Sequence, residues 1–159
     1  MPSTITWRVR PGRSEDRAFI LRLVPRLADG FPLPTWRTDE EVVRAESATL
    51  EAALERGSNA DPLLIAETSA GEPGGFVYME QPIDYFRQTP QAHVGVLAVA
   101  AEAEGQGVGR ALLEAAERWA REQGLGMLTL NVFAGNTRAR KVYERLGYAP
   151  ETLRYVKTL

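Results

Sequence analysis

Three glycines at alternate positions, Gly105, Gly107 and Gly109, separate an apolar segment from an amphipathic one. Glycine lets a backbone adopt positive φ and approach an anion closely, and the first N–H groups of a helix point outward without an intrahelical partner. The helix dipole adds positive charge there, and Arg110 follows at once. The turn is therefore suited to hold a phosphate group such as a pyrophosphate. A tight strand-to-helix turn without a ligand could carry the same glycines, so the motif alone is weak.

Two other phosphate-binding loops fit this turn less well. A P-loop needs Lys followed by Ser or Thr after its last glycine, whereas Arg110 and Ala111 follow here. A dinucleotide-binding fold carries Gly-x-Gly-x-x-Gly after its first strand. The turn in this chain has Gly-x-Gly-x-Gly spacing and comes two-thirds of the way along the sequence. Neither class of nucleotide-binding protein is therefore favoured.

A second motif lies downstream of this turn. It has the pattern Asn-x-x-Ala-x-x-x-Tyr-x-x-x-Gly-Tyr and runs from Asn136 to Tyr148. Together with the apolar segment Leu97–Val99 and the glycine turn, it resembles the GNAT superfamily of N-acetyltransferases. The resemblance covers roughly residues 94–148. It implies an α/β fold with a mixed, mostly antiparallel sheet flanked by helices, in which the fourth and fifth strands are splayed. It also implies acetyl-CoA (coenzyme A) as the cosubstrate.

The same resemblance implies roles for individual residues. The backbone of Leu97, Ala98 and Val99 would pair with the pantetheine arm, with the Val99 N–H directed at the thioester carbonyl. Asn136 would form a hydrogen bond with the cofactor, and Tyr143 would lie near its sulfur. The pyrophosphate would be held by backbone N–H groups from Gln106, Gly107, Val108, Gly109, Arg110 and Ala111.

Glu104 departs from the family pattern, which has Gln or Arg at this position. A carboxylate next to a pyrophosphate is electrostatically unfavourable unless it points to solvent. We therefore leave Glu104 outside the predicted site and expect it to weaken cofactor affinity.

Acetylation of an amine requires the loss of a proton before attack. An amine of the lysine type has a pKa of about 10.4, so at pH 7 it is mostly protonated and not nucleophilic. Glu80, at the end of the third predicted strand, and His93, at the start of the fourth, are candidate bases. A water chain without a dedicated base is also open, since either side chain could be an exposed strand-end residue.

Tyr143 is the candidate general acid, because a phenol can protonate the departing thiolate while the Val99 N–H stabilises the oxyanion. A helical tyrosine beside apolar neighbours could also simply pack in the core. The motifs together predict transfer of an acetyl group from acetyl-CoA to a primary amine of a small molecule, peptide or protein. Two alternatives remain open: a non-catalytic acyl-CoA-binding sensor with the same fold, and an acyltransferase that uses another acyl group or acceptor.

Four residues are candidates to contact the acceptor. Phe31 and Trp36 belong to a Pro-rich loop, and Tyr85 belongs to the loop before the fourth strand. Loops carry specificity, although such aromatic side chains often only anchor their own loop. Asn131 follows an alternating apolar segment and is expected either to face the other side of the sheet, toward substrate, or to make a turn contact.

Hydrophobic periodicity predicts the elements that must position these residues. Helices are expected from Ser14 to about residue 28, from Thr38 to Gly57 with a Thr38–Glu41 capping box, from the glycine turn to Gly124, and over 137–146. Strands are expected over 5–9, 63–68, 76–80, 93–100, 128–132 and 153–157. The predicted order is β-α-α-β-β-β-α-β-α-β-β, which includes a seventh strand without an assigned range, in a single acetyltransferase domain over residues 1–159.

Amino-acid composition excludes several kinds of site and disfavours some classes of partner. The 159 residues carry a net charge of −2, no cysteine and one histidine. This composition excludes disulfides, a cysteine nucleophile and a multi-histidine cage, so we expect no metal. The lack of a basic field disfavours nucleic acid as a partner. With no signal sequence and no apolar run of about 18 residues, we expect a cytoplasmic protein without membrane contact. The resemblance also suggests a homodimer, and the amine acceptor stays unidentified.

Overall fold

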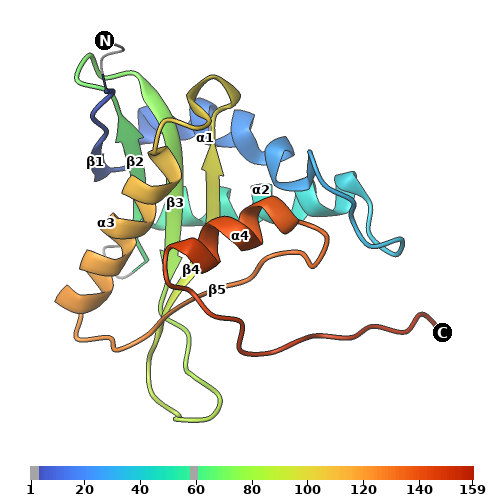
Figure 1. The fold of residues 1–159 in the computed structure, drawn as a ribbon. Coiled ribbons are helices and arrows are strands. Elements are labelled where there is room, and N and C mark those ends of the chain that lie inside the picture. The colour runs from blue at the N-terminus through green and yellow to red at the C-terminus, as the bar shows by residue number, and fades with distance from the viewer. Residues whose placement is uncertain (1–3, 58–60) are drawn as a thin grey trace.

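The computed structural model describes residues 4–57 and 61–159 and contains a five-stranded sheet (Figure 1). The strands lie in chain order, and each of the first three pairs antiparallel with the next, whereas the last two, β4 and β5, pair parallel. The mixed, mostly antiparallel sheet expected from the sequence is thereby confirmed. The strands are β1 (Arg8–Pro11), β2 (Leu63–Glu67), β3 (Pro73–Glu80), β4 (Ala92–Val99) and β5 (Leu128–Leu130).

Helices cover both faces of the sheet. In Figure 1, α1 (Arg17–Leu23) and α2 (Asp39–Arg56) lie behind it, and α3 (Val108–Glu122) and α4 (Thr137–Arg145) lie in front. The core between these layers is apolar, because alternate residues of β3 and β4 face one layer and the residues between them face the other. On α3 the buried side chains recur at helical spacing, and they are Val108, Leu112, Leu113, Ala115, Ala116 and Ala120.

Local signals fix the ends of α2 as expected. The Glu41 N–H donates to Thr38 Oγ1 over 3.2 Å, and the Thr38 N–H donates to Glu41 Oε2 over 2.9 Å. This reciprocal pair is the predicted capping box. At the other end, Gly57 takes the left-handed conformation with φ 55°.

The first helix is shorter than expected. A short 3-10 turn precedes α1, and a second 3-10 turn over Val24–Ala28 replaces the helical continuation expected up to residue 28. Pro25 explains the change, since its ring and missing N–H are incompatible with the middle of an α-helix. The apolar stripe is kept, so Ile20, Leu23 and Val24 are still buried.

A bulge in β4 opens the sheet. The register between β3 and β4 shifts after Tyr78, so Gly95 has no direct partner on β3. Pairing between β4 and β5 covers only Ala92–Val94 against Leu128–Leu130. Because a bulge bends its strand, β4 diverges from β5 beyond Gly95. The predicted splay of the fourth and fifth strands is confirmed.

The end of the chain differs from the expected order. No strand follows α4 within the described residues 149–159, and the segment predicted as a strand over 153–157 runs away from the sheet (Figure 1). Leu153 and Tyr155 are 74% and 86% exposed, so the alternating apolar residues have no face to cover and no neighbouring strand to pair with. The strand predicted over 128–132 likewise ends at Leu130.

Candidate functional site

A cleft of about 800 Å³ lies where β4 and β5 separate. One wall is the unpaired edge of β4, and the other comes from the segment between β5 and α4 and from α4 itself. The glycine turn and the start of α3 close one end, and the 3-10 turn after α1 and part of α2 complete the lining. Segments that are far apart in the chain, between Arg26 and Arg145, therefore converge on one cavity.

The backbone of β4 offers hydrogen-bonding groups to this cleft. The Ala100 N–H donates to Gly74 O over 2.8 Å, and backbone groups on an antiparallel strand alternate in direction. The N–H and C=O groups of Val99 and Leu97 therefore point away from β3, toward the splay. Arg26 Nε donates to Val99 O over 2.6 Å, which agrees with this direction. Leu97, Ala98 and Val99 all line the cleft.

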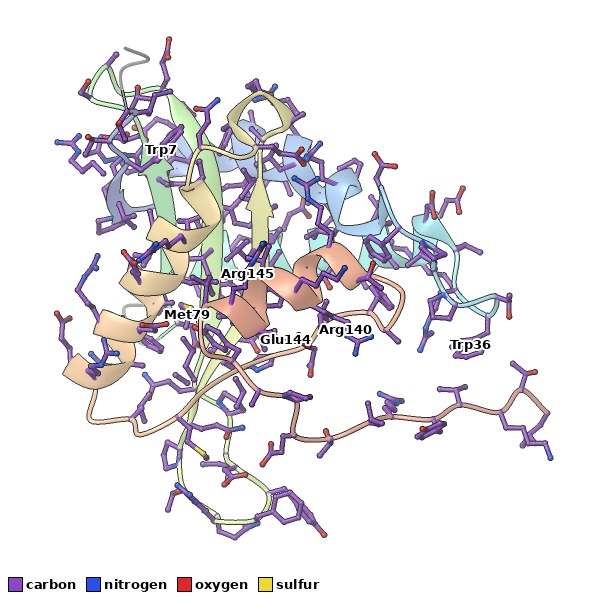
Figure 2. All side chains as sticks on the ribbon, in the orientation of Figure 1. Trp7, Trp36, Met79, Arg140, Glu144 and Arg145 are labelled. Atoms are coloured by element: carbon purple, nitrogen blue, oxygen red, sulfur yellow. The ribbon has the colours of Figure 1, made fainter. Side chains whose placement is uncertain are left out.

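The glycine turn is held in shape by its surroundings. Gly105 and Gly107 adopt φ values of 73° and 84°, which strongly favour glycine. Trp7 Nε1 donates to Gln106 O over 2.9 Å, and Figure 2 shows Trp7 beside the start of α3. Gly107, Val108, Gly109 and Arg110 line the cleft, whereas Gln106 and Ala111 lie outside its lining. The Ala111 N–H already donates to Gly107 O over 3.0 Å.

Glu104 lies at the cleft rather than in open solvent. Its carboxylate is paired with Arg26, and Arg138 Nη1 approaches its other oxygen to 3.5 Å. The two arginines come from opposite sides of the cleft, one from the 3-10 turn after α1 and one from α4. The negative charge that seemed unfavourable in the sequence is therefore balanced by these two cations.

The second motif places Asn136 and Tyr143 on the wall facing β4. Asn136 Oδ1 caps α4 by accepting the Ala139 N–H over 3.2 Å. Tyr143 lines the cleft about two helical turns further on, and its ring meets Tyr148 edge-on at 6.1 Å. Burial raises the pKa of Tyr143 above that of a free phenol. Its hydroxyl forms no hydrogen bond within residues 4–57 and 61–159, so a protonated donor is available to the cleft.

The two predicted bases, Glu80 and His93, face each other across β3 and β4. Neither lines the cleft. His93 Nδ1 lies 2.8 Å from Thr129 Oγ1 on β5, and burial lowers the pKa of His93, partly offset by the charge of Glu80. A Cβ atom at Gly95 would lie 3.3 Å from Glu80 Oε1, so this carboxylate sits directly beside the cleft residue Gly95.

The structure separates the four predicted acceptor residues. Phe31 and Asn131 line the cleft, and Phe31 contacts Phe133 with ring centroids 5.8 Å apart. Trp36 lies outside it, at the outer end of its loop in Figure 2. Tyr85 is 81% exposed in the loop between β3 and β4, also away from the cleft lining.

Comparison with known proteins decides the family. The model of the acetyltransferase (GNAT) family matches residues 27–148, which include the splayed strand, the glycine turn and the second motif. The chain belongs to this family. A solved Pyrococcus furiosus protein assigned as an acetyl transferase has a TM-score of 0.75 and 26% identity, over 97% of this chain and 100% of that one. An aminoglycoside N-acetyltransferase solved in complex with CoA shares the fold, with a TM-score of 0.73 and 20% identity over 99% and 98% of the two chains.

Two curated members of the family are also similar in sequence. The mycothiol acetyltransferase of Saccharomonospora viridis is 33% identical over 146 residues, which is 78% of this chain and 47% of that protein. The mycothiol acetyltransferase of Nocardia farcinica is 32% identical over 153 residues, covering 94% of this chain and 47% of that protein. The chain thus spans about half the length of these curated relatives.

Five charged residues that line this GNAT cleft were not predicted from the sequence, and they are Arg26, Asp29, Glu46, Arg138 and Arg145. Glu46 had a detectable signal, because it lies four residues after Val42 and four before Leu50 on the buried stripe of α2. An acidic residue at such a position is unusual and could have been noted from the sequence. Arg26 had no such signal, since its contact with Val99 joins segments far apart in the chain.

No group of three or more His, Cys, Asp or Glu side chains that could hold a metal ion occurs among residues 4–57 and 61–159. Over the same residues, no helix has the length and apolar character needed to span a membrane.

Proposed function

We propose that this cleft binds acetyl-CoA and transfers its acetyl group to a primary amine. The observation that carries the proposal is convergence on one cavity of three features: the free edge of β4, the glycine turn at the start of α3, and Tyr143 with a raised pKa. A site that binds only an adenine nucleotide would not need the free backbone groups along the edge of β4. An extended chain ending in a thioester would use all three.

The backbone explains how such a cofactor would be held. Leu97 and Val99 present strand hydrogen-bonding groups to the splay, and Ala98 between them also lines the cleft, so an extended pantetheine arm can pair there in place of a strand. The pyrophosphate fits at the glycine turn, where N–H groups from Gln106 to Arg110 precede the paired part of α3. Asn136 lies within reach from the opposite wall, and its Nδ2 is not used by the cap.

The chemistry then follows from the groups at the end of this channel. A base removes a proton from the acceptor ammonium, and the neutral amine attacks the thioester carbonyl. The Val99 N–H is directed into the splay and stabilises the developing oxyanion. Tyr143 donates its proton to the departing thiolate. Glu80, whose carboxylate lies beside Gly95, and its strand partner His93 are the bases proposed from the sequence, and a water chain without a dedicated base is the alternative.

The acceptor belongs to the small-molecule or peptide amines. The similarity to mycothiol acetyltransferases makes mycothiol-type small molecules the first acceptors to test. A homodimer and a cytoplasmic location stay predictions from the sequence.

Calorimetric titration with acetyl-CoA, with dephospho-CoA and ATP as controls, tests the binding half of the proposal. An acceptor panel of spermidine, glucosamine, kanamycin and a dipeptide with a free N-terminus, read by release of the CoA thiol, tests the transfer half. We expect saturable binding of acetyl-CoA and amine-dependent thiol release. Absence of binding at millimolar acetyl-CoA would refute the proposal. Binding without thiol release, when mycothiol-type amines are included, would favour the acyl-CoA sensor.

A further inference from the structure

Glu46 occupies a position on α2 where the helical pattern calls for an apolar side chain. It follows Val42 by about one turn and precedes Leu50 by another, and both of these side chains are buried. Glu46 itself lines the cleft. In the described part of the chain it forms neither a hydrogen bond nor an ion pair. A half-buried carboxylate without a partner opposes folding, so packing does not explain its presence.

The part of β4 that lines the same cleft as Glu46 has one position without a side chain. Val94, Gly95 and Val96 line the cleft, and the bulge lies at Gly95. Because Gly95 has no side chain, the carboxylate of Glu80 lies directly beside it. Two carboxylates on neighbouring elements, α2 and β3, thus flank the floor of the cleft.

The other ionisable groups on this side are already engaged. His93 on β4 is held by Thr129, and burial lowers its pKa. Arg56 of α2 donates to the Tyr78 hydroxyl over 2.9 Å on β3. Burial, reinforced by the charge of Glu80, raises the pKa of Glu46 above the ordinary value of a glutamate.

We propose that Glu46 is the general base of this acetyltransferase, and that the acceptor is a cationic amine that reaches the thioester past the α2 side of the cleft. This inference rests on the proposed function and assigns the base to a residue outside both family motifs. Glu46 is favoured over Glu80 and His93 because it alone of the three lines the cleft.

Glu46 Oε takes one proton from the ammonium group, and the freed nitrogen lone pair forms the C–N bond at the thioester carbonyl. The tetrahedral intermediate collapses as the C–S bond breaks, and the sulfur takes a proton from Tyr143. The second nitrogen proton leaves as the amide forms and returns Tyr143 to its protonated state through solvent. Glu46 then releases its proton to solvent, so the net products are an amide, CoA thiol and one proton.

The two carboxylates also explain selection of a cation. An ammonium group between Glu46 and Glu80 would be attracted by both, whereas a neutral alcohol would gain little and leave both charges desolvated. The side wall of the cleft is therefore suited to a primary amine with a high pKa. A carboxylate with a raised pKa is a stronger base than an exposed glutamate, which suits this proton transfer.

The test compares kcat/KM against pH for the wild type, Glu46→Gln, Glu46→Asp and the matched control Glu55→Gln, which changes an exposed carboxylate on the same helix. The acceptor is the panel amine with the highest wild-type kcat/KM. We expect Glu46→Gln to lose about 100-fold or more at pH 7. The loss should shrink by about tenfold per pH unit as the free amine becomes abundant, up to the pKa of the chosen amine at most. Glu46→Asp should keep the acid limb of the profile, and Glu55→Gln should match the wild type.

Three results would overturn the proposal. One is an unchanged pH profile in Glu46→Gln. Another is a loss of equal size at every pH, because that would indicate a structural or binding role. The third is removal of the acid limb by Glu80→Gln or His93→Gln while Glu46→Gln retains it. Acetyl-CoA titration of each variant shows whether the cleft is intact. A wild type that binds no acetyl-CoA would refute the proposed function itself, which is a distinct outcome.

Discussion

Replacing Gly109 with leucine should weaken cofactor binding while leaving the fold intact. Gly109 lies in the first turn of α3 and, unlike Gly105 and Gly107, does not have a positive φ. A Cβ atom there would meet only Val99 Cγ2, at the ordinary contact distance of 3.9 Å. The side chain would therefore extend into the cleft between the glycine turn and β4.

The size of the effect follows from what the leucine would displace. A hydrogen bond between a backbone N–H and a charged phosphate oxygen contributes about 1.5–3 kcal/mol. Loss of one such bond would weaken acetyl-CoA binding by about 2–3 kcal/mol, or roughly 30- to 150-fold in Kd. The free energy of unfolding should rise rather than fall, since glycine is less favourable than leucine in a helix by up to about 0.8 kcal/mol.

Calorimetry with acetyl-CoA and a thermal unfolding scan give the two readouts. Gly126→Leu is the matched control, because a Cβ atom at Gly126 meets nothing within 4 Å and the residue lies outside the cleft lining. The control should bind acetyl-CoA as the wild type does. Tight binding by Gly109→Leu, within threefold of the wild type, would refute the placement of the pyrophosphate at this turn.

The remaining predictions concern catalysis, charge at the cleft and stability. Tyr143→Phe should lower kcat by about 100-fold and leave the Kd of acetyl-CoA unchanged, and an unchanged kcat in steady-state assays would show that another group protonates the thiolate. Glu104→Gln should tighten acetyl-CoA binding about fivefold at low salt, because it frees Arg26 to face the phosphates, and weaker binding would contradict this reasoning. Arg10→Leu should lower the free energy of unfolding by about 3 kcal/mol at pH 7, since it leaves the buried Asp16 carboxylate without its partner. Because Arg10 holds the pKa of Asp16 below its usual range, this loss should shrink below about pH 4 in urea unfolding experiments, and a loss that grows on acidification would be inconsistent with the pairing.

Features set by neighbouring residues could be predicted from the sequence. The boundaries of α2 follow from the Thr38–Glu41 capping box and from Gly57, both of which are short-range signals. The glycine turn likewise requires only that Gly105 and Gly107 adopt positive φ. The family motif implies that Tyr143 lies near the cofactor sulfur; Tyr143 lines the cleft, and its role as general acid stays a prediction.

Features set by tertiary packing could not be predicted in this way. Whether Trp36 faces the cleft or solvent depends on how its loop crosses the sheet edge, which aromatic content does not encode. The segment 153–157 alternates as a strand does, yet a strand forms only where another strand pairs with it. Pairing of Glu104 with Arg26 joins residues 78 positions apart, so sequence alone shows only an unfavourable charge.

The central claim is acetyl transfer within the cleft, and isotope transfer tests it most directly. The protein would be incubated with acetyl-CoA carrying a deuterated acetyl group and with each amine of the panel, extended to mycothiol-type amines. Mass spectrometry of the products would be read beside release of the CoA thiol. We predict a deuterated amide on at least one amine, with one thiol released for each amide formed. Saturable binding of acetyl-CoA with no labelled amide on any amine would contradict the account.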